Sequence, residues 1–269
     1  MEDLHKTMAN DGHNLCKANI SKIIKSEGYR FVKARKVLTS NDPLYREKLA
    51  EITSILSNLK PREKFFSIDE FGPLAITIKG GRSWTPPGDH KIVPQWQKSK
   101  GSLIVTAALE LSTNQVTHFY SSRKNTDEMI KLLEMLINQY KDEELIYFSW
   151  DAASWHASKK LYMKVAEVNE ESYRKINNTP LVKLAPLPSC AQFLNVIESI
   201  FSGMAKAIIH NSNYNSVEDC MLAIDRYFIE RNQAFIENPK RAGDKIWGKE
   251  ITKAEFNKSN NCKSPRYGY

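Results

Sequence analysis

Apolar residues recur every three or four positions in two segments near the start of the chain, a pattern typical of helices with one buried face. The first predicted helix lies at 17–28, and the second is expected to begin at Asp42, an N-cap followed by Pro43 in the first turn. The apolar stripes are Ile20, Ile23 and Ile24 in the first helix, and Leu49, Ile52, Ile55, Leu56 and Leu59 in the second.

From Lys64 onward, short apolar runs and alternating stretches predict strands instead of helices. The predicted strands are FFSID (65–69), LAITIK (74–79), SLIVTAALE (102–110) with QVTHFYSS (115–122) as its hairpin partner, ELIYFSWD (144–151) and PLVKLAPLP (180–188). The Gly80-Gly81 pair after LAITIK predicts a tight hairpin. The run ELIYFSWD is compactly apolar, which suits the buried centre of a sheet.

Helical spacing separates and follows the later strands. Predicted helices lie at 126–140 with Thr126 as N-cap, in the polar stretch 154–175, along the stripe Leu194, Ile197, Phe201, Met204 and Ile208, and from Ser216 to Gln233. Consecutive strands pair antiparallel, and strands that are reached through helices add in parallel. The order therefore predicts an α/β fold, a mixed sheet of three antiparallel and two parallel strands that is flanked by helices.

The composition excludes several protein classes. The chain has 269 residues and is 41% apolar, but no apolar run approaches the roughly 20 residues that cross a bilayer. The first ten residues lack the apolar segment of a secretory signal, so we expect a cytoplasmic protein with no membrane partner. Four cysteines are far apart and include no Cys-x-x-Cys pair, which supports neither a zinc site nor a disulfide framework.

Positive charge is concentrated at the two ends of the chain. The net charge is +8, and residues 17–36 contain seven basic groups against one acid, while residues 239–269 contain eight against three. The rest of the chain is slightly acidic, so the pattern indicates basic arms that bind a polyanion. Solvated basic faces are also common in proteins that bind none. The candidate DNA-binding residues are Lys17, Lys22, Lys25, Lys33, Arg35 and Lys36.

Three acids occupy positions where a charge is costly. Asp69 and Asp151 each end a predicted apolar strand, and Glu198 lies within an apolar helix. If the two strands are neighbours, both aspartates emerge at the same sheet edge, and the following helix could bring Glu198 over them. Clustered carboxylates need a cation, and an all-oxygen set suits Mg²⁺ or Mn²⁺. Two such ions could activate a nucleophile against a phosphodiester.

Each acid also has a purely structural explanation. Asp69 and Glu70 could simply end a strand before the Gly72-Pro73 turn. Asp151 could cap a helix beginning near Ser154, and Asn195-x-x-Glu198 fits a capping box. His156, five residues after Asp151, is expected either to line the same cleft or to cap that helix. The tryptophans Trp84, Trp150 and Trp155 are expected in the core.

Three ordered blocks resemble the signature motifs of bacterial insertion-sequence transposases of the mariner superfamily. They are SIDE (67–70), SWDAASWH (149–156) and LPSCAQFLNVIES (187–199). The resemblance extends from about Lys64 to Gly248 and implies an RNase H-like catalytic domain of the DDE type. It assigns the catalytic and metal-binding roles to Asp69, Asp151 and Glu198, and places Asn195 in the family's Leu-Asn-Pro-Ile-Glu block, where Val196 replaces the proline.

The resemblance also implies an activity and its partners. Such enzymes use Mg²⁺, for which Mn²⁺ can substitute, and two ions are expected. They recognise terminal inverted repeats, cleave DNA there and join the 3′ ends to target DNA. A homodimer associated with the bacterial nucleoid is expected. The expected domains are a truncated helix-turn-helix remnant with linker (1–63), the catalytic domain (64–235) and a basic tail (236–269). An inactive DNA-binding remnant, or an RNase H-like nuclease that acts on other nucleic acids, remains open as an alternative.

Overall fold

The computed structural model describes residues 2–33 and 40–243, which fall into two units that are considered separately. The smaller unit contains α1 (Glu2–Asn10) and α2 (Lys17–Ser26). The helix predicted at 17–28 is therefore confirmed as α2, with Ile20 buried and Ile24 half-buried. Ile23 was expected on the same apolar stripe but is 47% exposed, because the two short helices cover only part of that face.

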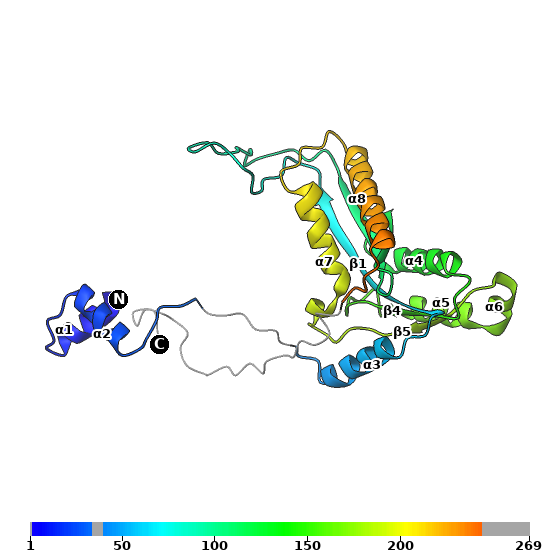
Figure 1. The fold of residues 1–269 in the computed structure, drawn as a ribbon, viewed down its shortest axis with the longest axis horizontal. Coiled ribbons are helices and arrows are strands. Elements are labelled where there is room, and N and C mark those ends of the chain that lie inside the picture. The colour runs from blue at the N-terminus through cyan, green and yellow to red at the C-terminus, as the bar shows by residue number, and fades with distance from the viewer. Residues whose placement is uncertain (1, 34–39, 244–269) are drawn as a thin grey trace. The chain divides into compact units, whose positions relative to one another are not determined.

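The larger unit is a five-stranded sheet with helices on both faces (Figure 1). Its elements are α3 (Tyr45–Ser57), β1 (Glu63–Ala75), β2 (Ser102–Glu110), β3 (Gln115–Ser121), α4 (Thr126–Gln139), β4 (Leu145–Ser149), α5 (Lys159–Asn169), α6 (Glu171–Asn177), β5 (Leu181–Leu184), the 3₁₀ turn η1 (Gln192–Leu194), α7 (Val196–Met204), the π-helical turn η2 (Ala205–Ile209) and α8 (Val217–Glu237). Within the described ranges, every helix is too short or too polar to span a bilayer.

The sheet order is β3-β2-β1-β4-β5. β1 pairs antiparallel with β2, and β2 pairs antiparallel with β3, whereas β1 with β4 and β4 with β5 are parallel pairs. The predicted mixed sheet, three antiparallel strands plus two parallel, is confirmed. β1 lies at its centre, where Glu63–Ser67 pair with β4 and Phe66–Ala75 pair with β2.

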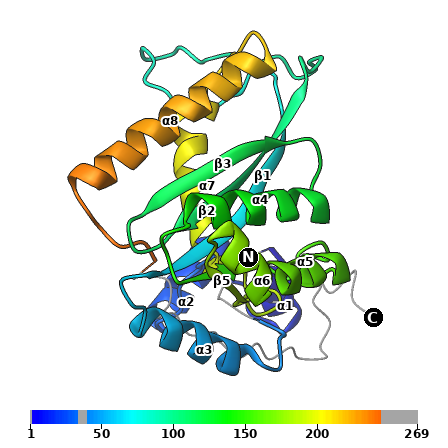
Figure 2. The same ribbon diagram turned by 90° about the vertical axis from the view of Figure 1, so that its right-hand side faces the viewer.

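Two apolar clusters fill the space between the sheet and its helices. Alternate residues of β1 point to opposite faces: Phe65 packs in one cluster with α3, α7 and α8, and Phe66 and Ile68 pack in the other with α4 and α5. Figure 2 shows α4 in front of the sheet and α7 behind it. The predicted stripe of α3 is confirmed, with Ile52 buried at 1% exposure against the first cluster.

The predicted hairpin at Gly80-Gly81 is wrong. Leu74 and Ala75 belong to β1, which pairs directly with β2, and the chain makes a long excursion through residues 77–100 before β2 begins (Figure 1). Ile76 pairs with Gly101 across the base of this excursion, through an N–H···O bond of 2.9 Å. Neither glycine adopts the left-handed conformation that a two-residue hairpin needs. Trp84 lies in the excursion and is fully exposed, which corrects its expected place in the core.

Several helix boundaries differ from the sequence expectations for local reasons. α3 begins at Tyr45 because the Asp42 carboxylate accepts the Leu44 N–H at 2.9 Å, which keeps the preceding residues in a turn. The side chain of Asn125, not Thr126, caps α4. α5 begins at Lys159 with Ser158 as its cap, five residues later than expected, because the preceding loop is folded around His156.

The last two helices also depart from the pattern. α7 ends at Met204, and the apolar stripe continues to Ile208 within η2. α8 has the predicted cap, since the Ser216 hydroxyl accepts the Asp219 N–H, and it extends to Glu237.

Candidate active site

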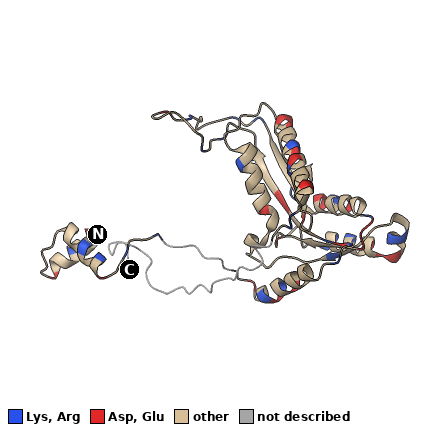
Figure 3. Ribbon diagram, in the orientation of Figure 1, with Lys and Arg blue, Asp and Glu red and all other residues tan. Residues whose placement is uncertain are grey.

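The register between β1 and β4 sets two aspartates at matching positions. Ser67 pairs with Ser149 at the end of the parallel ladder, and Asp69 and Asp151 each follow two residues later. Because the two strands are parallel, both carboxylates lie just beyond the end of the β1–β4 ladder. The expectation that Asp69 ends its strand is wrong, because β1 continues to Ala75 along β2. The juxtaposition that the strand pattern predicted is present. Figure 3 shows acidic residues of β1, in red, on the segment beside α7.

The first turn of α7 is attached to β1 by a hydrogen-bonded chain. Asn195 Nδ2 donates to Asp69 Oδ2 at 3.0 Å, and Ser67 Oγ donates to Asn195 Oδ1 at 2.6 Å. The Ile197 N–H in turn donates to Ser67 Oγ at 3.1 Å. Asn195 and Ser67 are both buried. These bonds fix where α7 begins relative to Asp69, and with it the position of Glu198.

The capping-box explanation of Asn195 and Glu198 is wrong. Asn195 does precede α7, but its side chain makes no cap bond and turns to Asp69 instead. The helix-cap explanation of Asp151 is also wrong, since Ser158 caps α5. Asp151 Oδ1 instead accepts the Ala153 N–H at 3.1 Å and lies 2.9 Å from His156 Nδ1.

Negative charges accumulate around Asp69. Burial raises the pKa of its carboxyl to about 7; the Glu70 N–H opposes this rise, and the charges of Asp151, Glu70 and Glu198 add to it. Glu198 is exposed as a residue, yet desolvation of its carboxyl and the charge of Asp151 raise its pKa as well. Three acids from β1, the end of β4 and α7 therefore act on one another electrostatically.

Asp151 has a cationic partner. Burial alone would lower the pKa of His156, but hydrogen bonds to Asp151 and Glu70 outweigh burial and raise it to about 9. The imidazole is therefore protonated at neutral pH, and its hydrogen bond is the main cause that lowers the pKa of Asp151. His156 is 1% exposed, so it lies behind the acidic edge and not in an open cleft.

Glu70 belongs to this cluster, although nothing but a turn position was expected for it. Its side chain is 2% exposed, and its Oε1 accepts from Trp155 Nε1 at 3.0 Å and lies 3.4 Å from His156 Nε2. A sequence signal existed: Glu70 follows Phe66 and Ile68 at strand spacing, on a face that is otherwise apolar. Of the other two tryptophans expected in the core, Trp150 is buried and Trp155 is half-buried against the α4–α5 cluster.

The chemistry of the three carboxylates fits a hard divalent cation. All three acids offer oxygen, the ligand atom that hard divalent cations prefer, and burial together with the neighbouring carboxylates raises the pKa of Asp69. Over the described residues, no three His, Cys, Asp or Glu side chains are already arranged to hold a metal ion. Both oxygens of Asp69 accept hydrogen bonds, from Glu70 N and Asn195 Nδ2.

The candidate DNA-binding lysines lie in the smaller unit. Lys22 and Lys25 are exposed on α2, and Lys33 is exposed after it. Lys17 is exposed but forms an ion pair with Glu2, which reduces its free charge. Arg35 and Lys36 lie outside the described residues, as does most of the basic tail.

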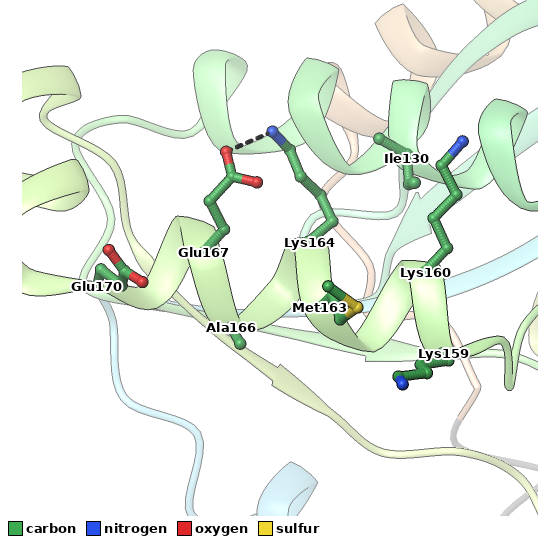
Figure 4. Close-up of a pocket in the computed structure, with 8 residues that line it drawn as sticks. All are labelled: Ile130, Lys159, Lys160, Met163, Lys164, Ala166, Glu167 and Glu170. Atoms are coloured by element: carbon green, nitrogen blue, oxygen red, sulfur yellow. Dashed lines mark hydrogen bonds and ion pairs between the residues drawn. The ribbon is translucent and has the colours of Figure 1, made fainter.

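A groove between α4 and α5 lies away from these acids (Figure 4). It is lined by Ile130, Lys159, Lys160, Met163, Lys164, Ala166, Glu167 and Glu170. Lys164 pairs with Glu167 at 2.9 Å across the groove wall, and with Glu134 at 3.1 Å. Lys160 pairs with Asp127. Because Lys160 and Lys164 are already paired with acids, these two lysines favour phosphate binding in the groove less than free lysines would.

Comparison with known proteins identifies the family. The model of the DDE superfamily endonuclease family matches residues 64–221, more than half of the chain and a span that includes the three acids. No curated protein matches the chain in sequence.

Solved transposase structures share the fold. The Mos1 transposase paired-end complex with left transposon end matches at a TM-score of 0.56 and 14% identity, covering 88% of this chain and 74% of that one. The mariner Mos1 paired-end complex with Mg matches at 0.58 and 11%, covering 91% and 71%. The catalytic domain of Mos1 mariner transposase matches at 0.50 and 12%, covering 77% of this chain and 92% of that one. The chain belongs to the DDE superfamily endonuclease family.

Proposed function

We propose that this protein is a transposase whose Asp69, Asp151 and Glu198 hold divalent cations and direct the cleavage and joining of DNA strands. The observation that carries the proposal is the acidic cluster just beyond the end of the β1–β4 ladder. Burial and three neighbouring acids raise the pKa of Asp69 to about 7 in the absence of a cation. Such a cluster costs stability, and a bound cation would remove that cost.

The role of each side chain follows from its place in the cluster. Asp69 and Asp151, each two residues beyond the last pair of the β1–β4 ladder, would hold the cation, and Glu198 would complete the set from α7. When bound, Mg²⁺ or Mn²⁺, expected as two ions, supplies charge that activates a nucleophilic hydroxyl and stabilises the leaving oxygen of a phosphodiester. Asn195 holds Asp69 in place, and the buried His156 holds Asp151.

The structural relatives support DNA as the substrate. Mos1 transposase has been solved with its left transposon end and as a strand transfer complex, and its paired-end complex has been solved with Mn and with Mg. By analogy, the terminal inverted repeats of a mobile element and a target duplex are the proposed substrates, with water as the nucleophile for cleavage and a 3′ hydroxyl for joining. A homodimer and an origin in a bacterial insertion sequence are part of the same proposal.

The exposed lysines of the smaller unit suit a supporting role. Lys22, Lys25 and Lys33 present cations to solvent at a part of the chain that precedes the catalytic domain. Contacts between such side chains and phosphates bind DNA without reading its sequence. We propose that residues 1–63 are a DNA-binding region and linker, that residues 64–235 are the catalytic domain and that residues 236–269 are a basic tail.

Nicking of a supercoiled plasmid tests the proposal without knowledge of the inverted repeats. Wild-type protein is incubated with the plasmid in Mg²⁺, in Mn²⁺ and in EDTA, beside Asp151→Asn. This substitution keeps an oxygen that can accept from His156 and removes the charge. Asp225→Asn is the matched control, because Asp225 pairs with His118 between β3 and α8, away from the acids.

We expect nicking in either metal for the wild type and for Asp225→Asn, and none in EDTA or with Asp151→Asn. Equal nicking by wild type and Asp151→Asn would contradict the assignment. A folded wild-type protein that binds DNA and cuts nothing in either metal would favour an inactive DNA-binding remnant.

A further inference from the structure

A buried chain of polar side chains lies behind Asp151. His156 Nδ1 is 2.9 Å from Asp151 Oδ1, and His156 Nε2 is 3.4 Å from Glu70 Oε1. Trp155 Nε1 donates to the same Glu70 oxygen at 3.0 Å. The side chains of His156 and Glu70 are 1% and 2% exposed. Buried polar groups with such a complete set of partners are costly to remove and hold their neighbours in one orientation.

Aromatic rings fix the plane of the imidazole. Trp150 lies against His156 with ring centroids 5.5 Å apart and planes inclined by 32°, and Trp155 meets it edge-on at 5.7 Å. Lys124 Nζ also donates to the Glu70 backbone oxygen at 2.9 Å, which ties this part of β1 to the start of α4. The ring therefore has little freedom to turn away from Asp151.

The arrangement determines which oxygen of Asp151 faces a ligand. The bonds from His156 and from the Ala153 N–H both end on Oδ1. Oδ2 is the oxygen left to an incoming cation, and its direction is set by the two bonds to Oδ1. Mutation of a residue that hydrogen-bonds to a metal ligand typically lowers metal affinity or activity by about 10–100-fold.

We infer that Glu70 and His156 are positioning residues that aim the Asp151 carboxylate at the cation. Glu70 Oε1 accepts hydrogen bonds from His156 Nε2 and from Trp155 Nε1. The bond to Nε2 orients the imidazole so that its Nδ1–H points toward Asp151. The inference rests on the proposed function and deepens it, because it explains why a glutamate is buried on the apolar face of β1. It also distinguishes the two aspartates: Asp69 is held by Asn195, which precedes α7, and Asp151 is held by Glu70 through His156.

Binding of Mn²⁺ in the absence of DNA tests the inference with a readout other than activity. Free Mn²⁺ is followed by electron paramagnetic resonance during titration of the full chain. His156→Asn can place an amide N–H near the position of Nδ1, within reach of Asp151. His156→Gln places its amide near the position of Nε2, toward Glu70. The two variants are similar in burial and polarity and differ in which contact they keep.

We expect His156→Asn to bind Mn²⁺ within about 3-fold of the wild type and His156→Gln to bind it about 10-fold more weakly. Equal affinities for the two variants, or a stronger loss in the asparagine variant, would overturn the inference. For Glu70, leucine removes the acceptor at similar volume and should weaken Mn²⁺ binding about 10-fold, whereas glutamine keeps an acceptor oxygen and should remain within about 3-fold of the wild type. A folded Glu70→Leu protein with wild-type affinity would also overturn it.

Two further proteins separate this inference from the proposed function. Asp225→Asn weakens another His–carboxylate pair and should leave Mn²⁺ affinity unchanged. If wild type and Asp151→Asn bind Mn²⁺ equally, the metal site itself fails and the positioning role falls with it. If Asp151→Asn loses binding while both His156 variants match the wild type, the metal site stands and the positioning role alone fails. Should Glu70→Leu not fold, the His156 pair decides the question.

Discussion

Replacement of Asp69 by asparagine should stabilise the metal-free protein at neutral pH. Asp69 carries a charge that burial and the neighbouring acids disfavour, and its pKa rises from 3.8 to about 7. The folded state therefore binds a proton between pH 4 and pH 7 that the unfolded state does not bind. By linkage, the free energy of unfolding falls as the pH rises through this window, and the penalty is complete above pH 7.

The size of the effect follows from the shift. A change of about 3 pKa units corresponds to about 4 kcal/mol, and solvent screening of a partly exposed carboxylate reduces this to about 2–4 kcal/mol. Asparagine keeps an oxygen for the Glu70 N–H but presents an amide to the Asn195 Nδ2 donor, which costs about 1 kcal/mol. The expected net gain is about 1–3 kcal/mol at pH 8.

Urea denaturation in EDTA, at pH 8 and at pH 4, measures this gain. Asp69→Asn should be more stable than the wild type at pH 8 and should lose the advantage at pH 4, where Asp69 is protonated in the folded protein. The same variant should lose metal-dependent nicking. A variant that is less stable than the wild type at pH 8, or an advantage that persists unchanged at pH 4, would refute the electrostatic reasoning.

Three other outcomes are expected. Asp42→Asn should lower the free energy of unfolding by about 1–2 kcal/mol at pH 7, because hydrogen bonds from Lys48 and the Ser189 N–H hold the pKa of Asp42 at about 2. This contribution to stability is present above pH 3.8 and disappears as the pH falls toward 2. Urea titrations of both proteins at several pH values would show it. Asn195→Ala should cost about 1–3 kcal/mol in the same assay, because it removes the acceptor of the Ser67 hydroxyl and the side-chain donor to the Ile68 carbonyl, and it should weaken nicking. Replacing Lys22 and Lys25 together by alanine should reduce the salt slope of DNA binding by about 2, measured by fluorescence anisotropy from 50 to 200 mM salt; an unchanged slope would mean that α2 does not contact phosphate.

The sequence predicted most of the sheet and the proximity of Asp69 and Asp151. Both results depend on local pattern: compact apolar runs locate β1 and β4, and parallel pairing alone brings Asp69 beside Asp151. The place of Asn195 beside Asp69 was not predictable in this way, since its local pattern equally fits a helix cap. The distinction comes from the Ser67 hydroxyl, 128 positions away in sequence.

The errors occurred where a local signal competed with a distant partner. Gly80-Gly81 has the composition of a hairpin, but β1 finds its partner only at β2, beyond the 77–100 excursion. Trp84 lies in that excursion, so it never reaches the core that its side chain would suit. Glu70 was overlooked because a glutamate before a Gly-Pro turn looks solvated, and its partners Trp155 and His156 come from a loop 85 and 86 positions later.

Anomalous X-ray scattering from Mn²⁺ tests most directly whether the three acids form one cation site. Crystals of the wild type and of Asp151→Asn would be grown without DNA and soaked in Mn²⁺. We predict one or two anomalous peaks in the wild type, each with carboxylate oxygens of Asp69, Asp151 or Glu198 at about 2.0–2.3 Å from the ion. These peaks should be absent from the variant. Saturating Mn²⁺ that gives no peak among these carboxylates, or the same peak in both proteins, would contradict the assignment.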